Sequence, residues 1–172
     1  MRWAAGALAV VALTASRPLG AQRAVNALTA SARADRAWVA QGDSVGILVT
    51  LDLAESFHVW PHEPVLPPAL ARFRPIPTDI TPQRLPPRAS IECIHWPTPE
   101  PVTVQYIGAP LQLLSYTGTV QARVLLRLQP DAEPGRATTV LRVRYQACDE
   151  RQCYPPADKD VVVRFQVVRP ER

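Results

Sequence analysis

The sequence from Tyr145 to Pro156 reads Tyr-Gln-Ala-Cys-Asp-Glu-Arg-Gln-Cys-Tyr-Pro-Pro and holds two of the three cysteines of the chain. Apolar or β-branched residues recur at every second position on both sides of this stretch, from Thr139 to Tyr145 and from Val161 to Val167. This is the period of a strand. Four residues separate the cysteines, and a loop of this length commonly joins antiparallel strands. The sequence therefore predicts a hairpin with Cys148 and Cys153 facing each other across its neck.

Two interpretations of a Cys148–Cys153 bridge are open. Opposed residues of an antiparallel pair have Cα atoms about 4.5 or about 5.5 Å apart, and a disulfide accepts both separations. Closing so short a loop stabilises the fold by only about 2 kcal/mol in the chain-entropy model, so a structural clip gains little. The other interpretation is a dithiol that opens when a partner's thiolate attacks one sulfur.

The pattern Tyr-Gln-x-Cys, a short polar loop and Cys-Tyr-Pro-Pro resembles the active-site hairpin of the N-terminal periplasmic domain of the thiol:disulfide interchange protein DsbD. A weaker resemblance extends from Ala37 to Val168. It includes Gly42-Asp43, the aromatic stretch Phe57-His58-Val59-Trp60-Pro61, and Tyr116-Thr117-Gly118. The resemblance implies an all-β fold, namely an immunoglobulin-like β-sandwich.

The resemblance also implies a function. The family's dithiol receives electrons from a membrane thiol reductase through a thioredoxin-like donor. It passes them to a periplasmic disulfide isomerase or to a thioredoxin-like protein of cytochrome c maturation. Carried over by motif, Cys148 and Cys153 are the catalytic pair of a protein-disulfide reductase component that needs no cofactor, with Cys153 as the attacked sulfur and Cys148 as the resolving thiol. Four aromatic residues would frame this site: Tyr145, Tyr154, His58 and Trp60.

The sequence departs from the family in two ways. Known members have one more residue between the cysteines, and a cap loop with an acidic pair and a phenylalanine covers their dithiol. The nearest candidate for this cap, Thr98 to Gly108, lacks that combination. Within the hairpin, Asp149 and Glu150 disfavour a thiolate whereas Arg151 favours it. The sequence does not fix the net sign of these effects. Our hypothesis is that the thiol pKa is not strongly lowered and that the partner's thiolate opens the bond.

The first 21 residues read as a secretory signal. Arg2 precedes an apolar run from Ala4 to Ala15, too short to span a bilayer, and Pro18-Leu19-Gly20-Ala21 suits cleavage near Ala21. The alternative is an uncleaved anchor. The signal predicts a periplasmic or secreted protein, soluble after cleavage, with residues 22–36 as an N-terminal extension or edge strand and residues 37–169 as the redox domain.

Composition excludes several functions. The chain has 19 Lys and Arg residues against 15 Asp and Glu residues; without Arg2 and Arg17 the balance is 17 against 15, a net charge of about +2. The basic residues are scattered, whereas a nucleic-acid site needs clustered charge and stacking aromatics, so we expect no nucleic-acid partner. The 7 glycines do not form a phosphate-binding loop.

The segment from Pro61 to Pro110 carries 13 of the 19 prolines. Proline lacks the amide donor that a strand or helix needs. We therefore expect long proline-rich loops over one end of the sandwich, with short strands near Ala71–Pro75 and Ile91–Trp96. Clear alternation predicts further strands over residues 45–53, 112–116, 119–128, 136–148 and 160–168. Some seven to nine short strands are typical of a β-sandwich.

Other chemistry is weakly indicated. Cys93 alternates with Ile91 and is expected to be a buried small residue, although a third redox thiol or a dimer bridge is possible for an odd cysteine. The Cys-x4-Cys spacing is looser than that of zinc sites, so a metal site using the cysteines and His58 is a minor alternative and no metal is predicted. The main alternative to redox function is a non-catalytic β-sandwich binding module with a structural hairpin disulfide.

Overall fold

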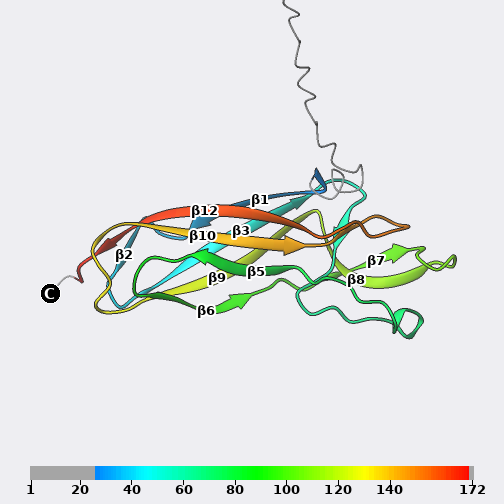
Figure 1. The fold of residues 1–172 in the computed structure, drawn as a ribbon, viewed down its shortest axis with the longest axis horizontal. Coiled ribbons are helices and arrows are strands. Elements are labelled where there is room, and N and C mark those ends of the chain that lie inside the picture. Colours follow the sequence, from blue (N-terminus) through cyan, green and yellow to red (C-terminus); the bar gives the residue numbers. More distant parts are fainter. Residues whose placement is uncertain (1–25, 171–172) are drawn as a thin grey trace, which may run out of the picture.

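The computed structural model describes residues 26–170. The predicted signal segment, residues 1–21, lies outside these residues. The described chain forms an all-β, immunoglobulin-like sandwich with long proline-rich loops, so the predicted fold class is confirmed (Figure 1). It has twelve strands, of which three are only two or three residues long.

Two four-stranded sheets make the body of the sandwich. The first contains, in spatial order, β1 (Leu28–Ala34), β3 (Ser44–Leu53), β9 (Thr119–Leu128) and β6 (Ala89–His95). The second contains β2 (Trp38–Ala40), β12 (Ala157–Val168), β10 (Gly135–Tyr145) and β5 (Asp79–Arg84). Neighbouring strands are antiparallel except for the parallel pair β2 and β12. The alternating segment at the start of the described chain is thus an edge strand, β1.

The alternation seen in the sequence decides which side chains enter the core. Along β9 the residues at even positions, from Val120 to Leu128, are buried, and those at odd positions are exposed or partly exposed. β10 and β12 alternate in the same way. Because successive side chains of a strand point to opposite faces, the buried sets of both sheets meet in one apolar core.

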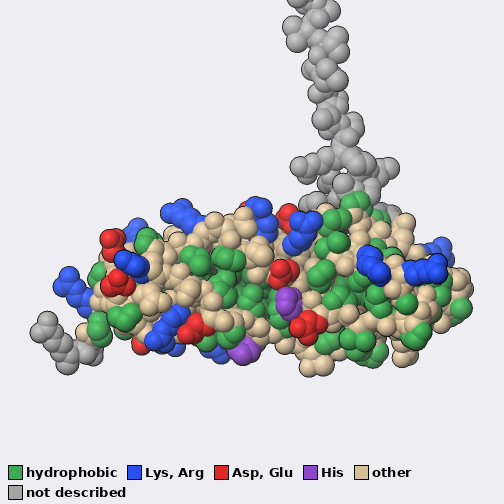
Figure 2. All heavy atoms as spheres, turned by 60° about the horizontal axis from the view of Figure 1, so that its bottom comes forward, with side chains coloured by type: hydrophobic (Ala, Val, Ile, Leu, Met, Phe, Trp, Pro, Cys, Tyr) green, Lys and Arg blue, Asp and Glu red, His purple; other side chains and the backbone are tan. Residues whose placement is uncertain are grey.

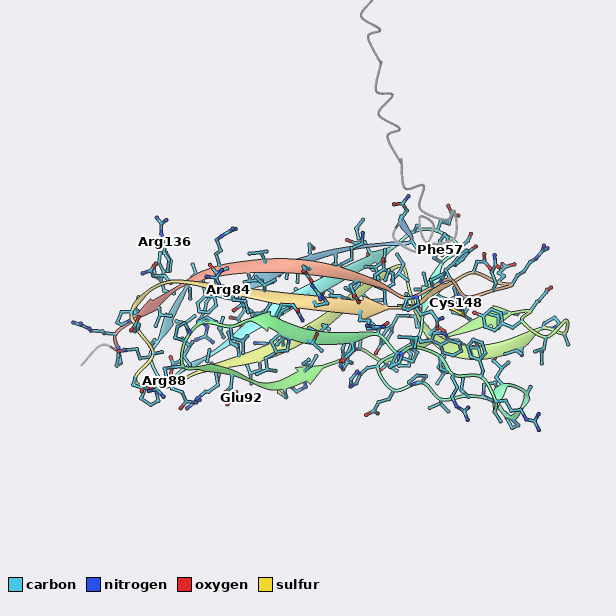
Figure 3. The ribbon with its side chains drawn as sticks, in the orientation of Figure 1. Phe57, Arg84, Arg88, Glu92, Arg136 and Cys148 are labelled. Carbon is cyan, nitrogen blue, oxygen red and sulfur yellow. A yellow bond between two sulfur atoms is a disulfide. The ribbon has the colours of Figure 1, made fainter. Side chains whose placement is uncertain are left out.

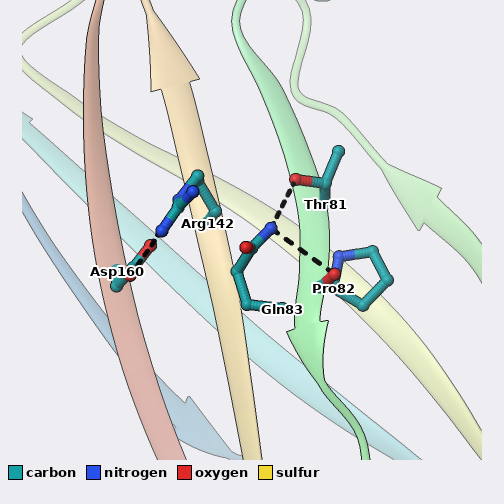
Figure 4. A network of polar contacts seen from close by, with 5 residues as sticks. All are labelled: Thr81, Pro82, Gln83, Arg142 and Asp160. Atoms are coloured by element: carbon teal, nitrogen blue, oxygen red, sulfur yellow. Dashed lines mark hydrogen bonds and ion pairs between the residues drawn. The ribbon is translucent and has the colours of Figure 1, made fainter.

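The strands that flank the cysteine stretch pair directly with each other. Leu141 of β10 lies opposite Val161 of β12, and Tyr145 lies opposite Ala157. On the outer face, the Arg142 guanidinium donates two hydrogen bonds to the Asp160 carboxylate, at 2.8 and 2.9 Å (Figure 4). This exposed pair adds little stability, but its geometry reports the same register as the core residues.

A third, smaller sheet lies at one end of the molecule, toward the right of Figure 1. It contains β11 (Ala147–Cys148), β4 (His58–Val59), β8 (Leu111–Thr117) and β7 (Glu100–Val104). A second apolar core supports it, formed by Trp60, Leu70, Val104, Leu113 and Cys148. Residues 60–78, which include the 3-10 turn η1 (Pro68–Leu70), connect β4 to β5.

The proline-rich segment contains more strand than we expect from its composition. β5, β6 and β7 all lie within it. β5 and β7 contain Pro82 and Pro101, and both are edge strands, where a missing amide donor is tolerated. The expected strand near Ile91–Trp96 is confirmed as β6. The expected strand near Ala71–Pro75 is wrong, because the chain turns there, with the Phe73 amide donating to the Leu70 carbonyl.

Charged side chains of both signs are mixed over the face shown in Figure 2. Within residues 26–170, no helix is long and apolar enough to cross a membrane.

Replacing Leu126, which is fully buried in the main core, with alanine is expected to lower the free energy of unfolding by about 2–5 kcal/mol, because it removes apolar contacts and leaves a cavity. Urea denaturation measures this change. Leu114→Ala is the matched control, since Leu114 is 42% exposed. An equal loss in both variants would contradict the assigned core.

Candidate active site

The cysteine hairpin is separate from the long β10–β12 pair. That pairing ends at Tyr145 and Ala157. After Tyr145 the chain no longer pairs with β12. The next strand, β11, pairs with β4 instead, so that Cys148 lies opposite His58. A shorter hairpin follows, in which the Tyr154 amide donates to the Ala147 carbonyl at 2.8 Å. The predicted hairpin neck is present, but it belongs to the third sheet.

Cys148 and Cys153 form a disulfide whose Cα atoms lie 3.9 Å apart. Cys148 is fully buried in the second core, whereas Cys153 is only partly buried. Figure 3 shows Cys148 and Phe57 in one half of the molecule and Arg84, Arg88 and Arg136 at the other end. Of the two cysteines, Cys153 is therefore the one with surface open to a partner.

Asp149 organises the loop between the cysteines. One carboxylate oxygen accepts hydrogen bonds from the backbone amides of Arg151 and Gln152, both at 2.9 Å. This is the local turn that aspartate favours. The other oxygen accepts a 2.6 Å hydrogen bond from the Tyr154 hydroxyl, and the Tyr154 ring lies 5.9 Å from the ring of Phe57. Tyr154 thus holds the loop between the cysteines in place, as well as following Cys153 in sequence.

Gln146 fastens the hairpin to the neighbouring loop. Its side-chain amide donates to the Tyr154 carbonyl at 3.2 Å, and its side-chain oxygen accepts from the Ile76 amide at 3.0 Å. Gln146 belongs to the Tyr-Gln-x-Cys motif, and the motif alone assigns it no role. The contacts with distant Ile76 could not be read from the sequence.

His58 lies beside the dithiol and is almost fully buried, at 2% exposure. Its Nε2 atom lies 2.8 Å from the Tyr106 hydroxyl oxygen. Burial lowers the pKa of His58 to about 4, against a smaller opposing effect of the Asp149 carboxylate. Burial, together with Asp149, also raises the pKa of Tyr106 well above its usual range. Both side chains are therefore neutral near pH 7.

Tyr106, in the loop between β7 and β8, contacts the disulfide at Cys153. Its hydroxyl oxygen lies 3.6 Å from Cys153 Sγ. The neighbouring Gln105 amide donates a 2.7 Å hydrogen bond to the Glu150 carbonyl, between the two cysteines. Gly108, with a φ of 89°, allows the tight turn that follows, since glycine adopts positive φ without strain. The loop is thus fixed directly to the cysteine hairpin.

Residues 26–164 match the family described as thiol:disulfide interchange protein DsbD, N-terminal. The chain belongs to this family. Membership places it among thiol–disulfide exchange domains, which interact with thioredoxin-like redox partners. No curated protein matches the chain.

Solved structures give only distant similarities. The N-terminal periplasmic domain of ScsB from Proteus mirabilis has a TM-score of 0.49 and 16% identity, over 78% of this chain and 44% of that one. A family 123 glycoside hydrolase from Clostridium perfringens has a TM-score of 0.45 and 10% identity, over 84% and 28%. The seventh ScaB type I cohesin from Pseudobacteroides cellulosolvens has a TM-score of 0.45 and 6% identity, over 83% and 94%. The chain thus spans less than half of the first two chains, and these similarities carry no functional argument.

As a member of the DsbD N-terminal family, the chain covers its dithiol in an unexpected way. Thr98 to Gly108 lacks the acidic pair and the phenylalanine of the family cap, yet the structure places Tyr106 of this segment on Cys153. A search for the family's residue types misses Tyr106. The available signal is the sequence Tyr106-Ile107-Gly108-Ala109-Pro110, a tyrosine at the start of a predicted turn between two alternating segments.

The other predicted residues lie in different places. Trp60 is buried in the second core, which also contains Cys148, and its ring lies 5.7 Å from that of Phe73. Tyr145 is buried in the main core, where burial and the charge of Asp158 raise its pKa to about 12.

The prediction that Cys93 is buried is wrong. It is partly exposed, not buried, because the β6–β9 register shifts between Ile91 and Cys93. Its sulfur lies 3.3 Å from His95 Nε2, on a different sheet from the dithiol. Within residues 26–170, no three His, Cys, Asp or Glu side chains are grouped closely enough to hold a metal ion.

The low pKa of His58 predicts a stability that depends on pH. The unfolded chain protonates this residue near pH 6.5, whereas the folded protein does so only near pH 4. Between these values the unfolded state binds the extra proton, so the contribution is fully present above about pH 6.5 and is lost as pH falls toward 4. We expect His58 to account for a loss of about 3 kcal/mol over this window.

Urea denaturation at pH 7.5, 5.5 and 4.5 tests this. His58→Gln is expected to remove this part of the pH dependence, whereas His95→Gln, at an exposed position, is expected to keep it. An identical pH slope in the wild type and His58→Gln would refute the assignment.

Proposed function

We propose that this protein is a periplasmic thiol–disulfide carrier that relays electrons through Cys148 and Cys153. The observation that carries the proposal is the placement of the disulfide in a member of the DsbD N-terminal family. Cys148 is buried and Cys153 keeps an accessible side. Such asymmetry suits a reaction in which a partner attacks one sulfur and the other leaves.

The hairpin has enough other contacts to keep its shape when the bridge is open. Backbone bonds join Tyr154 to Ala147 and Asp149 to Gln152, and the Asp149 carboxylate holds the loop. The side chain of Gln146 adds two further bonds. Since the disulfide adds little entropy stabilisation to so short a loop, its opening leaves the local fold intact.

The proposed reduction has two exchange steps. A thiolate of a reduced dithiol partner attacks Cys153 Sγ; a bond forms between these sulfurs, and the Cys148–Cys153 bond breaks with its electron pair leaving on Cys148. The partner's second thiolate then attacks the partner's first sulfur. The mixed disulfide breaks, its electron pair leaves on Cys153, and the partner departs oxidised. Two electrons have moved, and the two thiolates take up protons according to their pKa values.

The reduced protein would then donate by the same steps in reverse order. The proposed donor is a membrane thiol reductase or a thioredoxin-like domain, and the proposed acceptor is a periplasmic disulfide isomerase or a thioredoxin-like protein of cytochrome c maturation. Exposed apolar side chains near the Tyr106 loop suit docking of such a protein: Ile107 is 53% exposed and Leu114 is 42% exposed. The signal over residues 1–21 and the domain boundaries at 22–36 and 37–169 stay predictions.

A reduction potential above about −300 mV is expected for the Cys148–Cys153 bond, because structural bridges lie below that value. Equilibration of the Cys93→Ala protein in glutathione and dithiothreitol buffers measures it, with circular dichroism recorded on the same samples. A lower potential, or unfolding on reduction, would favour the alternative of a binding module with a structural bridge.

Trapping tests the assignment of Cys153. In a Cys93→Ala background, Cys148→Ser should accumulate a mixed disulfide with an oxidised thioredoxin-like partner, because Cys153 attacks the partner's disulfide and Cys148 is absent and cannot resolve the product. Cys153→Ser is the matched control and should trap far less, since Cys148 is buried. Equal trapping by both variants, followed on non-reducing gels, would contradict the proposed roles.

A further inference from the structure

Three polar groups lie in a row at the dithiol. His58 Nε2 is 2.8 Å from the Tyr106 hydroxyl oxygen, and that oxygen is 3.6 Å from Cys153 Sγ. The row joins three parts of the chain: β4, the β7–β8 loop and the redox hairpin. His58 and Tyr106 are both protic groups, and the electron relay as described above uses neither of them.

The number of hydrogens on each group limits which group can donate and which can accept in this row. A disulfide sulfur has no hydrogen and can only accept, so a hydrogen bond across this 3.6 Å contact requires the Tyr106 hydroxyl as its donor. The hydroxyl has a single hydrogen, which leaves its oxygen to accept from His58. A neutral imidazole has one N–H group, and burial keeps His58 neutral. If the hydroxyl hydrogen is directed to the sulfur, the proton of His58 must be on Nε2, and both donors then point toward the sulfur.

We propose that Tyr106 is a catalytic residue that donates a hydrogen bond to Cys153 Sγ, and that His58 is the positioning residue that directs the Tyr106 hydroxyl hydrogen to this sulfur. This inference rests on the proposed function and assigns residues to its chemistry. Hydrogen bonds to a charged acceptor are roughly twice as strong as those between neutral groups. The donor therefore acts mainly when Cys153 carries a negative charge.

That charge develops in the second exchange step. The partner's free thiolate attacks its own sulfur in the mixed disulfide, the bond to Cys153 breaks, and the electron pair leaves on Cys153 Sγ. The Tyr106 hydroxyl lies where this thiolate forms and needs no rearrangement to stabilise it. In the donating direction, the same bond increases the fraction of Cys153 that is thiolate and able to attack an acceptor disulfide.

The negative charge of Asp149 disfavours a Cys153 thiolate, and the Tyr106 hydroxyl offsets this effect. Asp149 acts electrostatically on both His58 and Tyr106, and its negative charge opposes a thiolate in the same hairpin. Its oxygens accept hydrogen bonds from Tyr154 and from two backbone amides, which hold the carboxylate in place within the hairpin. Glu150 and Arg151 are exposed, so solvent screens their charges. The Tyr106 hydroxyl is thus a fixed donor that offsets a fixed negative charge.

The test measures the pKa of Cys153 from the pH dependence of its alkylation by iodoacetamide. A Cys93→Ala, Cys148→Ser background of the whole protein leaves Cys153 as its single thiol. Tyr106→Phe, which removes only the hydroxyl, is expected to raise this pKa by about one unit, a roughly tenfold smaller thiolate fraction at a pH below the pKa. Tyr116→Phe is the matched control and should leave the pKa unchanged, because its hydroxyl donates to the Pro97 carbonyl instead.

His58 is tested by two substitutions in the same background. His58→Phe should shift the Cys153 pKa in the same direction as Tyr106→Phe, whereas His58→Gln, which retains an N–H donor, should restore most of it. A role in packing alone would not distinguish these variants by thiol pKa. If His58→Phe fails to fold, the glutathione equilibrium of the Tyr106→Phe disulfide form, compared with the wild type, decides whether the donor stabilises the reduced state.

The outcomes separate the two proposals. A Cys153 pKa that is unchanged in Tyr106→Phe overturns this inference alone and leaves the electron relay intact. A wild-type bridge that opens only when the protein unfolds overturns the proposed function, and with it the catalytic role of Tyr106. A raised pKa together with a bridge that opens in the folded protein supports both.

Discussion

The pairing of β11 with β4 is the constraint on which the site depends. Two residues after the end of β10, the chain leaves the second sheet, and Cys148 comes to lie opposite His58. This change of partner buries Cys148 in a second core and leaves Cys153 partly exposed. The main sandwich supplies the stability, whereas the small sheet holds the reactive atoms, so the two tasks are carried by different sets of contacts.

The environment of the dithiol combines burial with a few directed hydrogen bonds. Asp149 shapes the loop through the backbone, and Tyr154 closes over it. His58 stays neutral because it is buried, so it serves as a hydrogen-bond donor and not as a positive charge. The electrostatic balance at Cys153 therefore comes from one carboxylate and one hydroxyl held in fixed positions.

Strand alternation and the cysteine motif were sufficient to predict the sandwich, the β10–β12 pairing and the disulfide. These features depend on the alternation of apolar residues within each strand and on short connecting loops. Tyr106 could not be predicted in the same way, since its contact with Cys153 joins residues 47 positions apart. Cys93 was misplaced because a register shift in β6 breaks the alternation. The proline-rich strands were underestimated because proline is tolerated at sheet edges, and edge position is a property of topology.

The hydrogen bond from the Gln105 amide to the Glu150 carbonyl fixes the Tyr106 loop to the hairpin at a point on the protein surface. The carbonyl belongs to an exposed residue midway between the cysteines. A protein that docked here and offered its own backbone amide to this carbonyl would replace the hydrogen bond that fixes the Tyr106 loop. Such docking would change the position of Tyr106 relative to Cys153 without a direct contact to either side chain.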